Sequence, residues 1–200
     1  MKEENTPLIE TERLLLRKFT EQDLQDVFLI LCDKEANVFL PWFPAETLDQ
    51  ARKHLYDHYV AHYKRPCAYR YAICLKSDNR PIGYIGVGDG DSHDLGYGLR
   101  KQYWHLGIMT EAAKAVSERL RQAGGSYITA THDIHNPFSG EVMKKIGMTY
   151  RYSYEELWQP KNIRVTFRMY QLNFDGQDRT YAKYWDTYPI HFVEEGIGES

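Results

Sequence analysis

The stretch that decides the fold is LRKQYWHLGIMTEA, residues 99–112. Its first residue, Leu99, closes a predicted strand at 94–99, and residues 107–122 repeat apolar side chains at the 3.6-residue spacing of a helix. The first turn of a helix leaves about four N–H groups without intrahelical partners and carries roughly half a positive charge. A glycine at this turn, Gly107, lets an anion approach the main chain. The stretch therefore predicts an anion-binding turn, shaped for a diphosphate, between a strand and a helix.

Strands and helices continue on both sides of this turn. Upstream, the predicted elements are a strand at 8–19, helices at 20–31 and 47–63, and a hairpin of strands at 69–75 and 81–87. Downstream, they are a strand at 127–131, a short helix opened by Asn136-Pro137, and a hairpin at 150–157 and 163–172. The order predicts an α/β (α+β) fold with a mixed, mainly antiparallel sheet of six to seven strands, flanked by about four helices.

These motifs, in this order, resemble the GNAT acetyltransferases, in particular the branch of the Rim-type ribosomal-protein N-acetyltransferases. The Rim-type pattern Y-W-x-x-G-x-A-T-E-A is matched by YWHLGIMTEA at 103–112, and the family's N-x-x-S by Asn136-Pro137-Phe138-Ser139. The resemblance extends from about Thr11 to Phe174. It implies a sheet with splayed central strands and an acyltransferase that moves an acetyl group from acetyl-CoA to a primary amine.

The resemblance also implies a set of cofactor-binding residues. The pantetheine arm of acetyl-CoA would enter a gap beside the strand that ends at Leu99 and pair with the main chain of Leu99 and Arg100. Asn136 and Ser139 would contact the pantetheine and the nucleotide end. The diphosphate would be held by the amides of one continuous run: His105, Leu106, Gly107, Ile108, Met109 and Thr110.

Met109 departs from the family pattern, which has glycine or alanine at this position. Its long side chain either crowds the phosphates or points into the core and leaves its N–H free. Residue 109 lies on the same helical stripe as Ala112, Ala113 and Val116, which favours the second arrangement.

The expected chemistry is direct attack of a neutral amine on the thioester, with the oxyanion met by a main-chain N–H near Leu99 or Arg100. His132 is the candidate general base because an imidazole titrates in the right range, although a strand-end histidine bonded to Asp133 is the alternative. Met143 stands where the family carries a general-acid tyrosine, so water or another tyrosine is expected to protonate the leaving thiolate. Trp42 and Phe43 either line the acceptor site or anchor the first pair of helices.

Composition excludes several other classes of function. The net charge of -3 and the absence of a basic stripe argue against a nucleic-acid partner. No apolar run approaches the ~20 residues of a membrane span. Three cysteines without a C-x-x-C spacing predict a cytoplasmic, disulfide-free protein, and no metal-ligand pattern is complete, so no metal is expected. The predicted partner is a small-molecule or peptide amine.

The chain is expected to consist of an acetyltransferase domain at 1–176 and an aromatic-rich extension at 177–200. The extension is too aromatic for a solvated tail, so it should pack on the domain or on a partner subunit, and a homodimer is one of the arrangements considered. The alternative to an enzyme is a catalytically impaired CoA-binding or interaction module, which Met109 and the missing tyrosine motivate.

Overall fold

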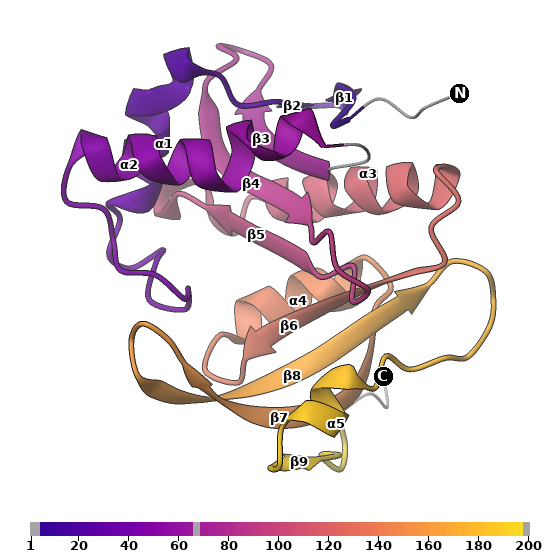
Figure 1. The fold of residues 1–200 in the computed structure, drawn as a ribbon. Helices are drawn as coiled ribbons and strands as arrows, with labels where there is room; N and C mark the ends of the chain where they lie inside the picture. The colour runs from indigo at the N-terminus through magenta and orange to yellow at the C-terminus, as the bar shows by residue number, and fades with distance from the viewer. Residues whose placement is uncertain (1–4, 66–68, 198–200) are drawn as a thin grey trace.

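The structure, a computed structural model, describes residues 5–65 and 69–197 and places the strands in two sheets (Figure 1). The first sheet has the order β1 (Ile9–Glu10), β2 (Leu14–Arg17), β3 (Tyr69–Leu75), β4 (Pro81–Val87) and β5 (Leu95–Leu99). The second has the order β6 (Tyr127–Asp133), β8 (Ile163–Asn173), β7 (Thr149–Trp158) and β9 (His191–Phe192). Every pair of neighbours within a sheet is antiparallel. The predicted mixed α/β fold is confirmed.

Four helices fall where the sequence predicts them, and a fifth, short helix in the C-terminal segment was not predicted. They are α1 (Leu24–Leu31), α2 (Leu48–Leu55), α3 (Ile108–Gln122), α4 (Pro137–Lys145) and the short α5 (Lys183–Thr187). Thr47 begins α2, because its hydroxyl accepts a hydrogen bond from the N–H of Gln50 and the Gln50 side chain accepts one in return. The predicted helix at 47–63 continues past α2 as a π turn at Tyr56–Val60.

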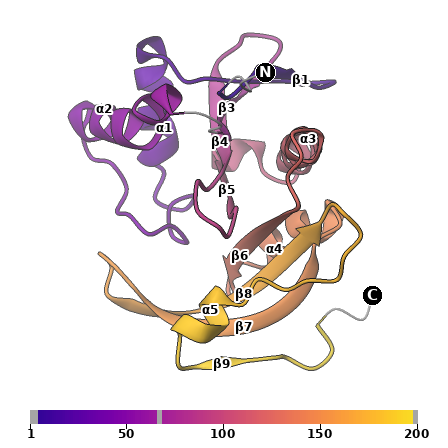
Figure 2. The ribbon, with the colours of Figure 1, turned by 45° about the vertical axis from the view of Figure 1, so that its right-hand side comes forward.

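Helices lie on both sides of the sheets. In Figure 2, α1 and α2 cover one face of the first sheet and α3 covers the other, while α4 lies on the α3 side of the second sheet. We call the α1/α2 side the front face and the α3/α4 side the back face. The main core fills the back face, where α3 buries Met109, Ala112, Val116 and Leu120 against the strands.

The described part of the C-terminal segment packs on the front face of the second sheet. Its aromatic side chains contact a buried cluster on β7 and β8; they are Tyr181, Tyr184, Trp185 and Tyr188. Residues 191–192 then add a strand to the edge of β7. The proposed domain boundary at residue 176 stays a prediction.

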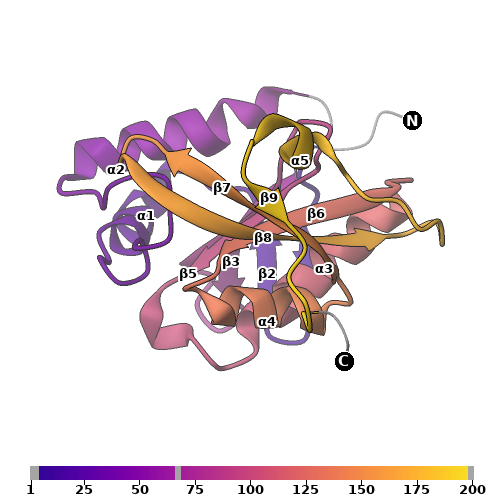
Figure 3. The same cartoon turned by 90° about the horizontal axis from the view of Figure 1, so that it is seen from below.

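β5 and β6 are parallel neighbours that separate along their length. Within residues 5–65 and 69–197 they are joined by a single bridge, between Asp94 and Thr129 at the start of both strands. Beyond this bridge they belong to different sheets, so the splayed central strands expected from the sequence are confirmed. At the far end, the β7–β8 turn reaches the loop after α1 (Figure 3), where the Lys161 ammonium donates to the carbonyls of Asn37 (3.0 Å) and Val38 (2.9 Å).

No helix in the described ranges has the length and apolar character to cross a membrane. Cys32 and Cys74 are free thiols, and Cys67 lies outside the described residues.

Candidate active site

The turn before α3 presents a run of unpaired main-chain donors. The first N–H of α3 with a hydrogen-bond acceptor is that of Glu111, which donates to the carbonyl of Gly107 (3.0 Å). Within the described part of the chain, the N–H groups of residues 105–110 have no acceptor. His105 (φ 60°) and Gly107 (φ 74°) are both left-handed, a backbone that turns successive N–H groups into an anion-binding concavity. This is the geometry that the sequence predicts.

A side-chain clamp fixes this turn to the first sheet. The Glu111 carboxylate accepts hydrogen bonds from the Thr11 hydroxyl (2.6 Å), the Arg13 N–H (3.0 Å) and Arg13 Nε (2.6 Å). Arg13 also donates to the carbonyl of Leu106 (2.9 Å) within the turn. These bonds keep the pKa of Glu111 below its usual value despite partial burial. The sequence analysis missed this clamp, since its members lie about a hundred residues apart.

We expect Arg13→Lys to weaken acetyl-CoA binding by about tenfold. Lysine keeps the positive charge but cannot bond to Glu111 and Leu106 at once, so the turn loses its fixed shape. Isothermal titration with acetyl-CoA measures the effect. Arg121→Lys is the matched control, because Arg121 pairs with Glu118 at the opposite end of α3. Equal affinity of the two variants would show that the clamp does not support the turn.

A hollow of about 390 Å³ opens beside the turn. It is lined by Glu12, Gly107, Thr110, Glu111, Lys114 and Lys145. Of its charged groups, the Glu111 carboxylate is paired with Arg13, and the ammonium groups of Lys114 and Lys145 outnumber the remaining carboxylate, that of Glu12. Together with the unpaired N–H groups, these lysines suit a ligand with phosphates.

Met109 does not block the turn. Its side chain is only 8% exposed and packs in the main core, as its place on the apolar stripe predicts. Because its N–H lies in the first turn of α3, that donor stays free.

The main chain of β5 faces the gap at alternate residues. The carbonyl of Asp94 accepts from Gly88 (2.8 Å) and the N–H of Arg100 donates to Ile82 (3.0 Å), so even-numbered residues bond to β4. Odd-numbered residues, including Tyr97 and Leu99, therefore direct their main-chain groups toward β6.

Arg100 differs from the sequence-based expectation, because its main-chain N–H bonds to Ile82 and cannot donate to pantetheine. Its carbonyl already accepts one hydrogen bond, from the N–H of Tyr103 (3.0 Å). Leu99 keeps its N–H toward the gap, whereas its carbonyl accepts from the Trp104 indole (2.8 Å). Of the two residues predicted to supply the oxyanion donor, Leu99 is therefore the one whose main-chain N–H is directed toward the gap.

Across the gap, α4 brings Asn136 and Ser139 to the opposite wall. Asn136 is the N-cap residue, and its side chain makes no bond to the first turn, which leaves its amide available. Ser139 is engaged: its hydroxyl donates to the Tyr97 hydroxyl (3.1 Å), which donates in turn to the Ser139 carbonyl (2.9 Å). Tyr97 therefore ties β5 to α4 on the back face, a role that the sequence did not reveal.

The sequence model of the acetyltransferase (GNAT) domain family matches residues 13–149, which include β5, the turn and α3. The chain is a GNAT acetyltransferase. Membership of this family makes it an acyltransferase rather than a binding module alone.

Known relatives agree in sequence and in fold. The GNAT chain is 27% identical over 146 residues to the uncharacterized N-acetyltransferase YoaA of Bacillus subtilis (strain 168), covering 70% of this chain and 82% of YoaA. It superposes on a GNAT-family acetyltransferase from Bacillus anthracis with a TM-score of 0.74 and 23% identity, over 84% of this chain and 99% of the other. It also superposes on RimL, a ribosomal L7/L12 alpha-N-protein acetyltransferase solved with coenzyme A, with a TM-score of 0.74 and 19% identity. That superposition covers 86% of this chain and 100% of the RimL chain. The last two likenesses show the shared fold.

On the front face of this GNAT gap lies a carboxylate that the sequence analysis left without a functional role, at the first residue of the predicted strand 94–99. Asp94 stands where β5 and β6 part, and its carboxylate accepts from the Thr129 hydroxyl (3.3 Å). No described cation pairs with it, and burial raises its pKa to about 6. Two residues along the same face, Gly96 is exposed, and a Cβ placed on it would meet no atom within 4 Å. The front face therefore holds open space at Gly96, two residues from a carboxylate whose pKa is raised.

His132 lies on the back face of this GNAT domain. It is 4% exposed, and its Nδ1 bonds to the carbonyl of Asp133 (2.8 Å), the alternative that the sequence left open. Its Nε2 has no partner among the described residues and lies against α4, where a Cβ on Gly140 would be 2.6 Å away. Burial lowers its pKa. Its role as a base stays an untested hypothesis.

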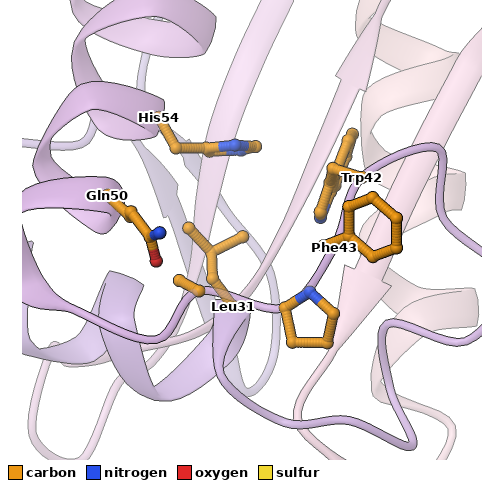
Figure 4. Close-up of a pocket in the computed structure, with 7 residues that line it drawn as sticks. Leu31, Trp42, Phe43, Gln50 and His54 are labelled. Atoms are coloured by element: carbon orange, nitrogen blue, oxygen red, sulfur yellow. The ribbon is translucent and has the colours of Figure 1, made fainter. Parts of the chain in front are cut away.

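Trp42 and Phe43 border a pocket of about 170 Å³ between the loop after α1 and α2 (Figure 4). The Trp42 indole donates to the buried Asn37 side chain (3.0 Å), and its ring meets His54 edge to face (4.9 Å), so Trp42 anchors the loop. Phe43 is 64% exposed at the rim. In the described residues no group of three side chains could hold a metal ion.

Proposed function

We propose that this GNAT protein transfers an acetyl group from acetyl-CoA to a primary amine by direct attack. The observation that carries the proposal is the run of unpaired N–H groups at residues 105–110, which opens α3 beside the parted strands β5 and β6. Unpaired donors at a helix N-terminus bind phosphates, and the adjoining gap has the extended main chain of Leu99 along one wall.

Three features support acetyl-CoA as the donor. The turn supplies donors for a diphosphate, Lys114 and Lys145 supply positive charge beside it, and the side chain of Met109 is withdrawn into the core. RimL, which shares the fold, was solved with coenzyme A. Asn136 on α4 is the proposed contact for the pantetheine arm from the opposite wall.

The proposed reaction uses Asp94 as general base. The acceptor ammonium gives a proton to the Asp94 carboxylate, directly or through one water, and the neutral nitrogen attacks the thioester carbon. Addition forms the C–N bond and a tetrahedral oxyanion; its collapse breaks the C–S bond, the second proton of the attacking nitrogen passes through water to the CoA thiolate, and Asp94 returns its proton to solvent. The N–H of Leu99 stabilises the oxyanion between these events.

Asp94 is better placed than His132 to accept the proton of the acceptor amine. A lysine amine has a pKa of about 10.4, roughly 3 pH units above 7.4, so it must be deprotonated before it can attack. An α-amine, with a pKa of about 7.7–8.0, is already partly neutral at this pH. A carboxylate whose pKa is about 6 accepts a proton more readily than an ordinary one and is still ionised at pH 7.4. The acceptor class stays open between peptide N-termini, small metabolites and antibiotic-like amines.

Replacing Gly107 with alanine should weaken acetyl-CoA binding about 10–100-fold. A methyl group at the turn obstructs the approach of the phosphates and strains the left-handed backbone (φ 74°). Gly124→Ala is the matched control: its φ of 85° imposes the same strain at the other end of α3, without any neighbouring atom within 4 Å. Both variants should lose similar thermal stability. Calorimetric titration separates them, and an unchanged affinity in the Gly107 variant would contradict the proposed site.

The function itself is tested by thiol release from acetyl-CoA with a panel of peptides, polyamines and aminoglycosides. The proposal expects amine-dependent release with at least one acceptor, together with a product that gains one acetyl group by mass. Tight CoA binding without turnover across the whole panel would contradict the proposed acceptor chemistry.

A further inference from the structure

Tyr84, on β4, carries a buried hydroxyl that has no hydrogen-bond partner in the described part of the chain. The residue is 8% exposed, and its Oη has no partner among the described residues. Buried hydroxyls are nearly always paired, and burial of this one raises the pKa of Tyr84 well above its ordinary value. By contrast, the hydroxyl of Tyr63, which packs against the same front-face core, donates a hydrogen bond to the carbonyl of Arg70 (3.0 Å). The unpaired hydroxyl of Tyr84 is therefore a candidate to form a hydrogen bond with a bound ligand.

The phenol of Tyr84 lies across the strand that edges the gap. Tyr84 is the direct partner of Gly98 on β5, and a Cβ on Gly98 would be 2.7 Å from three of its atoms, Cε1, Cζ and Oη. The absent side chain at Gly98 is thus what lets the ring extend from β4 over β5. Trp42 and Tyr59 pack beside the ring, with centroids 6.4 Å and 6.3 Å away, and hold it there.

The hydroxyl lies over Gly98, the residue before the main-chain donor proposed for the oxyanion. Leu99 follows Gly98 directly, and its N–H points from β5 toward β6 in the plane of the sheet. The Tyr84 hydroxyl lies over the preceding residue, Gly98, on the front face. The two donors are therefore neighbours along β5, one in the plane of the sheet and one on its front face.

We propose that Tyr84 is a catalytic residue whose hydroxyl donates a hydrogen bond to the thioester carbonyl oxygen, completing with the Leu99 N–H the site that stabilises the oxyanion. The inference rests on the proposed transfer from acetyl-CoA. The hydroxyl does not give up its proton: it stays protonated throughout the working pH range and strengthens its bond as negative charge develops on the oxygen.

The test is Tyr84→Phe, which removes the hydroxyl and keeps the ring. Loss of one oxyanion donor should lower kcat about 10²–10³-fold, with KM for acetyl-CoA changed by less than about twofold. The melting temperature should not fall, since no residue in the described ranges bonds to the hydroxyl. Tyr71→Phe is the matched control, because Tyr71 is a buried tyrosine on the back face of the same sheet.

A second readout needs no turnover. The infrared carbonyl stretch of bound acetyl-CoA, labelled with ¹³C at the carbonyl, should lie at lower frequency in the wild-type protein and the Tyr71 variant than in Tyr84→Phe. Equal frequencies, or equal kcat, would overturn the role of Tyr84 while leaving the proposed function intact. A wild-type protein that binds no acetyl-CoA would overturn both, and a lowered melting temperature with an unchanged carbonyl stretch would make the hydroxyl structural.

Discussion

Asp94→Asn is expected to lower kcat about 10²–10⁴-fold, the usual contribution of a positioned general base. The side chain keeps its size and its contact with Thr129 but can no longer accept a proton from the acceptor amine. The loss should be larger for a lysine-like amine than for a peptide α-amine, because the second is already partly neutral near pH 7.4. Thiol release measured with both kinds of acceptor checks this difference.

The same substitution should stabilise the fold at neutral pH. The folded pKa of Asp94, about 6, lies above its value of about 4 in an unfolded chain, so the folded state holds this proton more tightly. Stability is therefore lost as pH rises from about 4 to about 6, and the asparagine variant escapes that loss. Its melting temperature should exceed that of the wild type at pH 8, and the difference should disappear below about pH 4.

The pH profile also decides between Asp94 and His132. With Asp94 as base, activity rises with pH through about 6 and this limb is absent in Asp94→Asn. His132→Gln should keep the limb, since its Nε2 lies against Gly140 on the back face. A limb that survives in the asparagine variant and disappears in the glutamine variant would assign the base to His132.

Enlarging residue 96 should lower turnover step by step without harming the fold. A Cβ on Gly96 meets no atom within 4 Å, and its backbone is not in the left-handed region, so alanine, valine and leucine can be added at little cost to stability. Each addition fills the front face of the gap beside Asp94. We expect a graded loss of kcat/KM for the acceptor, reaching about 100-fold or more in Gly96→Leu, a loss of the size that misplaced reacting groups produce.

Steady-state kinetics and thermal melting of the three variants test this series together. The affinity for coenzyme A should stay within a few-fold of the wild type, because the diphosphate turn lies at the other end of the bound ligand. A Gly96→Leu protein with normal turnover would show that acceptors do not use the front face. A large fall in melting temperature would show instead that the space at Gly96 is not open.

The features that follow from local sequence could be predicted, and those that depend on distant pairing could not. The helix from Ile108, the unpaired turn before it and the inward side chain of Met109 follow from periodicity and from the first turn of a helix. The clamp of Arg13 on Glu111 joins residues 98 apart in sequence, and no local pattern marks it. The hydrogen bond between Tyr97 and Ser139 also joins residues far apart in the sequence, so no local pattern predicts it.

Two further misses have physical causes. Asp94 sits among turn-forming residues, and only the pairing of β5 with β6 shows that it stands where the strands part. Arg100 was assigned to pantetheine because the resemblance carried it over, whereas the register with β4 uses its N–H on Ile82. The strands β1 and β9 span two residues each, too short for an alternating pattern to indicate.

The most direct test of the account is a ¹⁵N NMR titration that follows the amides of residues 105–110 and of Leu99. With coenzyme A, both groups of signals should shift. With pantetheine, which lacks the diphosphate, only Leu99 and its neighbours in the gap should respond. Amide signals at 105–110 that stay unmoved at millimolar coenzyme A would contradict the claim that this turn holds the diphosphate.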